Sequence, residues 1–288
     1  MTMPERREKL VTLDEAIDSV KDDSSIAIGG SHAQIAPMAV IRGLIRKRAK
    51  GLKVYPSVTA GLPADFLIGG GCARTVYVSY LGLEKFGLAP NFRRAVQQGS
   101  IEIKECCEVY IVYGLKAGAS TLPFCVLPKG HQETSLLAVN SDYKLITDPY
   151  TGEEVVTIPA ITPDVGIIHV ARCDPYGNCL PSGSLSLMLL IAQASNRVIV
   201  TCEKIVSPEE TLAKGASIPG FLVDMVVEVP YGAHPTACHG EYSYDENHIE
   251  SYVRADPADY FDQYVHGPAT HGEYLDKIGR QALLALRY

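Results

Sequence analysis

Residues 198–245 decide the fold, and they read VIVTCEKIVSPEETLAKGASIPGFLVDMVVEVPYGAHPTACHGEYSYD. The stretch opens with an apolar segment, Arg197–Thr201, which is typical of a strand buried in a sheet. An Ile218–Gly220 turn and a second apolar run, Val223–Val227, follow. The run leads into Pro230–Pro235, where two prolines and a glycine predict a fixed loop at the end of the sheet.

Upstream of this stretch, helix and strand signals alternate. Thr12 and Glu15 have the spacing of a capping box at the start of a helix. The predicted helices are Leu13–Val20 and Pro37–Lys50, the latter ending at Gly51, and the predicted strands are Ser25–Ile28, Leu52–Tyr55 and Thr75–Val78. Strands that alternate with helices predict an α/β fold with a mainly parallel sheet flanked by helices.

The middle of the chain differs in composition. Residues 120–160 are rich in Pro, Gly and Thr, and Thr147–Val156 reads as a hairpin. Beyond it we expect a strand at Asp164–Val170, a tight turn at Asp174–Gly177, a helix at Gly183–Ser195, and two or three surface helices between Asp245 and Leu286. The favoured organisation is one domain over residues 1–288 with a small lobe around 120–160. The alternative is two domains that divide near Pro159–Pro163.

Composition narrows the class of protein. The chain of 288 residues has 47% hydrophobic residues and a formal net charge of −7 without blocks of like charge, which argues against a nucleic-acid-binding protein. No apolar stretch reaches the roughly 18 residues that a membrane span needs. Residues 1–10 lack the apolar core of a secretory signal. Eight cysteines are too few for a disulfide scaffold, so we expect reduced thiols and a cytoplasmic location.

The first candidate site is the segment Gly29-Gly30-Ser31-His32. It follows a predicted strand and precedes a predicted helix, and two glycines let a ligand approach the backbone closely. An ordinary tight turn explains the glycines equally simply. The chain has neither a G-x-G-x-x-G fingerprint nor a G-x-x-x-x-G-K-[ST] loop, which disfavours a dinucleotide enzyme or a P-loop nucleotidase.

Taken together, these motifs resemble the alpha subunit of family I coenzyme A transferases, most closely the glutaconate type. The resemblance is carried by Gly29, Gly30 and Pro37, by Leu122–Phe124, Asp164–His169, Thr201–Glu203 and Glu273–Gly279, and most specifically by Pro219–Asp245. It implies the NagB/RpiA-like fold of that family and a glycine loop that faces the reacting thioester. The chain has Gln34-Ile35-Ala36 where relatives often carry basic residues, so the acyl preference stays open.

The same resemblance implies how the enzyme is assembled. The nucleophile of two-subunit relatives is a glutamate in a Ser-Glu-Asn-type motif of the beta subunit. It attacks the acyl-CoA and forms covalent intermediates. The present chain contains no Ser-Glu dipeptide. The resemblance therefore implies a partner, the CoA-transferase beta subunit, in a heterotetramer of two alpha and two beta chains. It also implies coenzyme A thioester and a small carboxylic acid as substrates, with no permanently bound cofactor.

Glu108 is the candidate catalytic residue of a second hypothesis. The chain also resembles the CoA hydrolases that open steroid rings, and alignment on Gly99–Glu102 places their catalytic glutamate at Glu108. Next to Cys106, Cys107 and Tyr110, the carboxyl group would be partly desolvated and suited to act as a base. A solvated acidic segment is the plainer interpretation. A third hypothesis is a non-catalytic ligand-binding α/β protein.

Two further clusters favour no site. His234, Cys238 and His239 have a spacing that matches no usual structural zinc pattern and lack an evident fourth ligand, so we expect no metal there. Ser184 and Ser186 are not part of a G-x-S-x-G elbow, which leaves a serine hydrolase without support.

Overall fold

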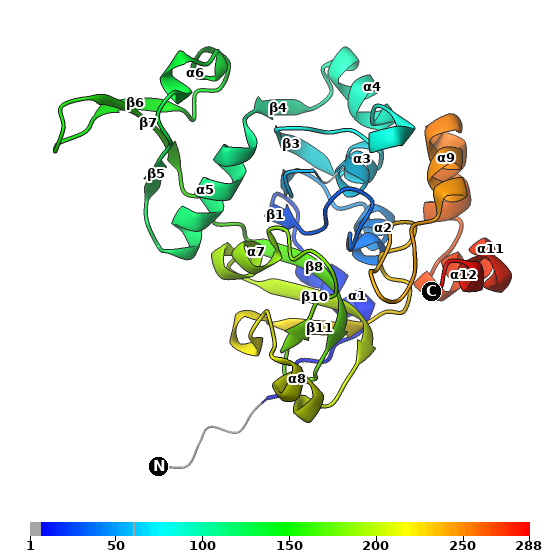
Figure 1. The fold of residues 1–288 in the computed structure, drawn as a ribbon. Coiled ribbons are helices and arrows are strands. Elements are labelled where there is room, and N and C mark those ends of the chain that lie inside the picture. The colour runs from blue at the N-terminus through cyan, green and yellow to red at the C-terminus, as the bar shows by residue number, and fades with distance from the viewer. Residues whose placement is uncertain (1–6, 60) are drawn as a thin grey trace.

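The computed structural model describes residues 7–59 and 61–288 and is built on one large sheet (Figure 1). Seven strands lie in the order β11-β10-β8-β1-β2-β3-β4, all parallel, and β9 pairs antiparallel with β8. The strands are β1 (Ser25–Ile28), β2 (Leu52–Pro56), β3 (Ala73–Val78), β4 (Glu102–Glu105), β8 (Val165–Cys173), β9 (Cys179–Leu180), β10 (Val198–Ile205) and β11 (Met225–Glu228). The predicted α/β class with a mainly parallel sheet is confirmed.

Side chains alternate between the two faces of this sheet, and both faces are buried. Ile26 and Ile28 of β1 contribute to one apolar cluster, whereas Ala27 between them contributes to the other. The same split separates Ile167 from Ile168 in β8. Successive residues of a strand point to opposite faces, so a sheet with helices on both sides needs apolar residues at nearly every position. The apolar strands of this chain meet that requirement.

Helices cover the two faces unequally. One face packs against α1 (Leu13–Ser19), α2 (Met38–Lys47), α3 (Gly61–Gly69), α4 (Pro90–Gln98), α9 (Glu246–Arg254) and α10 (Pro257–Phe261). The other packs against α5 (Glu108–Ala119) and α7 (Met188–Ala194), with contributions from α11 (His271–Ile278) and α12 (Arg280–Ala285). The remaining helix of the sheet region, α8 (Pro208–Lys214), joins β10 to the segment before β11.

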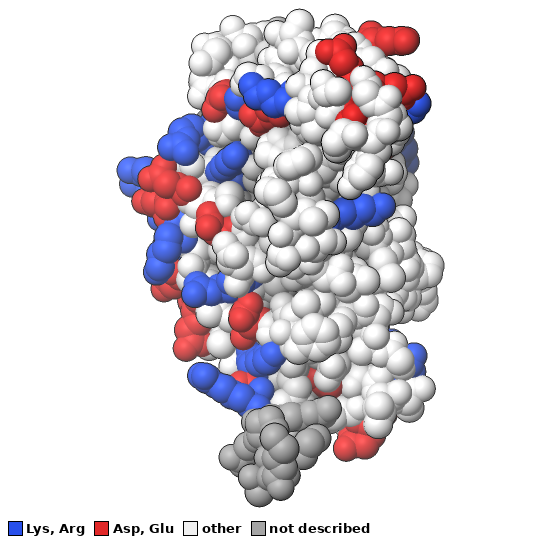
Figure 2. Space-filling model, turned by 90° about the vertical axis from the view of Figure 1, so that its left-hand side faces the viewer, with Lys and Arg blue, Asp and Glu red and all other residues white. Residues whose placement is uncertain are grey.

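A separate antiparallel sheet forms a lobe beside α5 (Figure 1). Its strands, in the order β5-β7-β6, are β5 (Phe124–Val126), β7 (Glu154–Pro159) and β6 (Lys144–Thr147), and the short helix α6 (Leu136–Val139) lies between β5 and β6 in the chain. These elements fall within the range 120–160 where a lobe was expected. Figure 2 views the side of the molecule that carries the lobe, and much of that face shows few charged side chains.

The local predictions hold in most elements. The capping box of Thr12 and Glu15 is formed, with both reciprocal hydrogen bonds present. The hairpin is confirmed as β6 paired with β7, and the predicted turn is closed by the Gly177 N–H, which donates to Asp174 O at 3.0 Å. The second helix stops at Arg48, which takes the left-handed conformation with φ +59°, rather than at Gly51.

Two predictions are corrected. The helix expected at Gly183–Ser195 begins only at Met188, because Gly183 and Ser186 both have positive φ and keep residues 183–187 out of the helical region. The C-terminal helices are not merely superficial, since Tyr252, Tyr260 and Tyr274 are buried. Residues 1–6, on which part of the secretory-signal expectation rests, lie outside the described residues. In the described part of the chain, no helix has the length and apolar character to cross a bilayer.

Candidate active site

The loop Gly29–His32 lies at the point where the sheet changes direction. From β1 the chain proceeds outward through β2, β3 and β4, and then returns to the other side of β1 to add β8, β10 and β11. In open α/β sheets, ligands bind at such a switch point, outside the carboxyl ends of the strands. The predicted glycine segment therefore occupies the position that topology favours for a ligand.

The two glycines are required by their surroundings. A Cβ on Gly29 would lie 3.0 Å from Ile168 Cγ2, so the end of β1 can pack closely on β8 only without a side chain. Gly30 has φ +102°, and a Cβ there would lie 3.0 Å from Ala36 Cα. These contacts are within the protein itself, so the turn explanation and the ligand explanation both remain compatible with the geometry.

Hydroxyl groups and the exposed His32 gather around this loop. Ser31 Oγ lies 3.0 Å from Thr59 Oγ1, and the His32 N–H donates to Thr59 O at 3.1 Å. His32 Nδ1 lies 2.7 Å from Glu84 Oε1, and both side chains are about half exposed. Three of the four predicted loop residues thus face β8 or the loop after β2, while His32 reaches the loop after β3.

Backbone strain is concentrated at the same edge. His32, Ile35, Glu84 and Ser186 are non-glycine residues with positive φ, between +43° and +53°. Ser186 belongs to the loop before α7, and its Oγ lies 3.0 Å from Ser57 Oγ, just beyond the end of β2. Strained conformations persist where surrounding structure fixes them, and they often mark sites of function. Sequence reasoning missed this contribution of Ser186, because no local signal joins residue 186 to residue 57.

Glu108 lies at the same edge of the sheet but apart from the glycine loop. It opens α5 directly after β4, three strands away from β1, which is roughly 14 Å at the usual strand spacing. Cys106 and Tyr110 are buried beside it, but Glu108 itself is exposed. The expected partial desolvation of Glu108 is wrong for this chain, because the residue is at the solvent-facing first turn of its helix.

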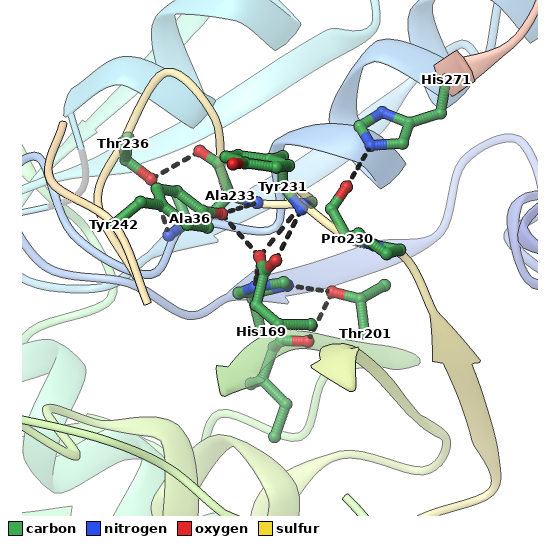
Figure 3. Close-up of polar contacts among 12 residues, drawn as sticks. Ala36, His169, Thr201, Pro230, Tyr231, Ala233, Thr236, Tyr242 and His271 are labelled. Atoms are coloured by element: carbon green, nitrogen blue, oxygen red, sulfur yellow. Dashed lines mark hydrogen bonds and ion pairs between the residues drawn. The ribbon is translucent and has the colours of Figure 1, made fainter. Parts of the chain in front are cut away.

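A buried polar network fixes the block 230–242 on the sheet (Figure 3). Glu203 of β10 accepts hydrogen bonds from the Tyr231 and Gly232 N–H groups, at 2.5 and 3.1 Å, and from the Tyr242 hydroxyl at 2.5 Å. Its Oε1 also lies 2.9 Å from His169 Nε2, and His169 is fully buried in β8. Glu203 therefore joins β8 and β10 to the loop that follows β11.

This block in turn supports the glycine loop. The Ile35 N–H donates to Ala237 O at 2.7 Å, and the Ala237 N–H donates to Ala33 O at 2.8 Å. The Ala36 N–H donates to Thr236 Oγ1 at 3.2 Å. Sequence reasoning quoted Asp164–His169 and Thr201–Glu203 as part of the resemblance, but it assigned no role to His169 or Glu203. Their pairing depends on two strands that are adjacent only in the folded sheet.

The suspected cluster of His234, Cys238 and His239 is not assembled. The buried His234 lies with Nδ1 2.7 Å from the Tyr274 hydroxyl and Nε2 3.2 Å from Asp245 Oδ2. Burial lowers the pKa of His234, so a neutral ring is favoured there. Cys238 instead lies near His169 and Glu203, with ligand atoms within 4.8 Å of one another.

Those three groups are already satisfied by protein partners. An ion between them would have to displace the donors that surround Glu203, two of which are backbone N–H groups that cannot rotate away. Burial raises the pKa of the Cys238 thiol, which disfavours the thiolate that a metal requires. Hydrogen bonding alone accounts for the cluster, and we assign it the structural role of fixing residues 230–242.

Comparison with known proteins places this architecture in a family. The family model described as "Coenzyme A transferase" matches residues 10–229. The chain belongs to the coenzyme A transferase family. The family is one of enzymes, and the resemblance noted in the sequence is confirmed.

Individual relatives match along nearly the whole chain. The first of the two subunits of 3-oxoadipate CoA-transferase from Pseudomonas knackmussii is 33% identical, with 94% of this chain and 98% of the relative covered. The crystal structure of glutaconate coenzyme A-transferase from Acidaminococcus fermentans superposes with a TM-score of 0.91 at 30% identity, covering 97% of this chain and 96% of that one. An uncharacterized protein from Archaeoglobus fulgidus is 37% identical over 96% of this chain, which spans 63% of that longer protein.

Proposed function

We propose that this chain is the alpha subunit of a heteromeric CoA transferase, which moves CoA between an acyl-CoA and a carboxylic acid. The observation that carries the proposal is the match to alpha-type transferase chains over nearly the full length, in a chain without a Ser-Glu dipeptide. The nucleophilic glutamate then comes from a separate beta subunit. The acyl-CoA thioester is a substrate, and no permanently bound cofactor is needed.

In this proposal the glycine loop forms one wall of the site. Gly29 and Gly30 lie at the switch point without side chains, so an acyl thioester can approach the backbone there. Ser31 and His32 supply a hydroxyl and an imidazole at the rim, held by Thr59 and Glu84 respectively. The block 230–242 holds the loop from behind through Ala237, so the wall is fixed before substrate binds.

The surface of the lobe supports a protein partner. Large apolar side chains are exposed there, at 37–60% of their full area; they are Leu122, Phe124, Val126, Val139, Leu145 and Ile146. Contiguous apolar surface of this kind marks interaction sites in proteins whose own core is complete. Any chain that functions only when assembled has such surface to cover.

The decisive experiment compares the chain alone with the chain plus a beta subunit. CoA exchange between an acyl-CoA and short dicarboxylates is measured with each preparation. We expect negligible turnover from the isolated chain and robust turnover from the pair. Robust turnover by the homogeneous single polypeptide would falsify the division of the site between two chains. Binding of acyl-CoA with no turnover in any pairing would favour the non-catalytic hypothesis.

A further inference from the structure

Cys107 occupies the junction between the edge strand and the lobe. It follows β4 and is the residue that precedes the first turn of α5, with φ −90° and ψ 166°. The helix has 12 residues, and the partial positive charge of its N-terminal end favours an anionic atom at this position. Cys107 is partly exposed, unlike its neighbour Cys106, which is buried.

The lobe places an imidazole against this thiol. His131 Nε2 lies 3.7 Å from Cys107 Sγ. The other ring nitrogen, Nδ1, lies 2.8 Å from Pro128 O, which can only accept a hydrogen bond. Nδ1 therefore carries the proton in the neutral ring, and the lone pair of Nε2 points to the thiol. A nucleophile, a base and a third group that orients the base are the parts of an activated nucleophile.

Tyr143 completes the arrangement from the other side. Its hydroxyl accepts a hydrogen bond from the Cys107 N–H at 3.2 Å and lies 3.6 Å from Cys107 Sγ. With its oxygen accepting from the backbone, the hydroxyl proton is free to point at the sulfur. Burial raises the pKa of Tyr143, which keeps this hydroxyl protonated and able to donate. Among the eight thiols, all of which lie in the described residues, Cys107 alone is within hydrogen-bond distance of an imidazole.

We propose that Cys107, activated by His131, is a second covalent acceptor that takes the acyl group of a thioester. The Cys107 thiol gives its proton to His131 Nε2 and its sulfur attacks the thioester carbonyl carbon. The bond between that carbon and the CoA sulfur breaks, and the departing CoA thiolate takes the proton back from His131. Acyl-CoA and a thiol become an acyl-cysteine and free CoA, so neither an oxidant nor a reductant is needed. The choice of acyl-CoA as donor rests on the proposed function.

Charged groups near the dyad bear on its pH response. Glu108 and Glu105 are exposed on either side of the Cys106–Cys107 pair, and their carboxylates oppose the helix N-terminus in favouring an anion. Asp142, from the lobe, accepts hydrogen bonds from the Tyr77 and Tyr110 hydroxyls and adds a negative charge behind the site. With these opposing charges near the sulfur, removal of the thiol proton depends on the base, His131.

The test uses the full chain without a partner and acetyl-CoA as the probe. Intact mass spectrometry follows the gain of one acetyl group, and neutral hydroxylamine confirms a thioester by removing it. We expect acetylation of the native chain, none in Cys107→Ser or Cys107→Ala, and native behaviour in Cys125→Ser. Cys125 is the matched control because it is also partly exposed in the lobe region and has no imidazole partner.

His131→Gln separates activation from packing. At neutral pH we expect acetylation slowed on the order of 10²-fold, the usual value of a positioned base. The deficit should shrink at pH 9, where a thiol ionises without help. Tyr143→Phe should slow the reaction less. The rate of Cys107 alkylation by iodoacetamide, relative to that of Cys125, reports the thiol's reactivity without any thioester.

The outcomes distinguish this proposal from the transferase proposal. Fast, His131-dependent alkylation and acetylation of the chain alone support the dyad even if no beta subunit restores CoA exchange. Acetylation that persists in both folded Cys107 variants overturns the proposal. So does a native chain whose Cys107 alkylates no faster than Cys125 and accepts no acetyl group, whatever its turnover with a partner. Circular dichroism and thermal unfolding establish that each variant is folded.

Discussion

Gly30 shows how one residue can serve the fold and the site together. Its φ of +102° is a conformation that L side chains rarely adopt, and an added Cβ would press on the backbone of Ala36. Sequence alone identified the glycine but could not separate a turn from a ligand loop. The topology now adds that this turn lies at the switch point of the sheet.

Gly30→Val is therefore expected to reduce the transferase kcat beyond its effect on folding. The matched control is Gly99→Val, because Gly99 also has positive φ, +62°, with no atom within 4 Å of an added Cβ. Each change should cost about 1–2 kcal/mol of unfolding free energy from the backbone conformation alone. Thermal unfolding and steady-state rates are measured on the same preparations. A loss of activity that only follows the folded fraction in both variants would show that the loop is structural.

Glu108→Gln discriminates between the two enzymatic hypotheses. With the nucleophile in the beta subunit, the assembled transferase should retain most of its kcat, because Gln preserves the shape of the exposed side chain. A ring-opening hydrolase would lose its base and on the order of 10²-fold or more in rate. Glu105→Gln, an exposed carboxylate at the end of β4, is the control. The exposure of Glu108 favours the transferase, and a collapse of kcat with folding unchanged would reverse that judgement.

At the scale of elements, the loop after β11 depends on a single carboxylate of β10. Glu203→Ala would leave the Tyr231 and Gly232 N–H groups and the Tyr242 hydroxyl without their acceptor. Such a loss in a buried network should lower the unfolding free energy by roughly 3–5 kcal/mol. Urea denaturation measures it against Glu209→Ala, whose carboxylate is at the surface start of α8. Equal stability of the two variants would contradict the role assigned to Glu203.

The docking of α9 onto the sheet should depend on pH. Burial lowers the pKa of His248 to about 3, and the Tyr260 hydroxyl donates to its Nε2 at 2.7 Å. The unfolded chain, with an ordinary histidine pKa near 6.5, then binds more protons than the folded chain below that pH. Stability is fully present above about pH 6.5 and decreases as the pH falls toward the folded pKa. This residue alone contributes a loss of about 3 kcal/mol by pH 4.

Neighbouring groups act in the same direction. Burial also lowers the pKa of His234. Burial alone would raise the pKa of Asp245, but hydrogen bonds from His234 and the His248 N–H outweigh it and lower that pKa. A depressed carboxyl pKa likewise removes stability as the pH falls. Urea denaturation at pH 7.5, 6 and 5 tests the trend, and His248→Gln should flatten it. A stability that is unchanged between pH 7.5 and 5 would contradict this account.

What sequence could predict differs between elements for physical reasons. Strands with β-branched residues, the capped helix α1 and the hairpin of β6 and β7 carry local signals, and the structure confirms them. The helix α3 is apolar on all sides and buried, so it lacks the one-sided periodicity by which a helix is recognised. The pairing of His169 with Glu203, and of Cys107 with His131, joins distant segments. Such contacts leave no trace in spacing along the chain.

For the whole molecule, we predict a complex of two alpha and two beta chains. Each copy of this chain contributes 31.2 kDa, so light scattering on the purified complex resolves a tetramer from a simple pair. The physical reason is the exposed apolar area of the lobe, which an isolated chain leaves in water. A mixture that yields turnover only as one alpha with one beta chain would correct the stoichiometry and leave the transferase proposal standing.

The pairing of Ile35 with Ala237 also has a consequence during synthesis on the ribosome. The strands β1 to β4 emerge early and are neighbours in the sheet, so they can assemble as they appear. The glycine loop at the end of β1 has to wait for about 200 more residues, because its backbone partners are Ala237 and Thr236. A nascent chain of 160 residues would thus hold half a sheet with an unsupported loop. Translation and maturation of this site are separated in time by the order of the chain itself.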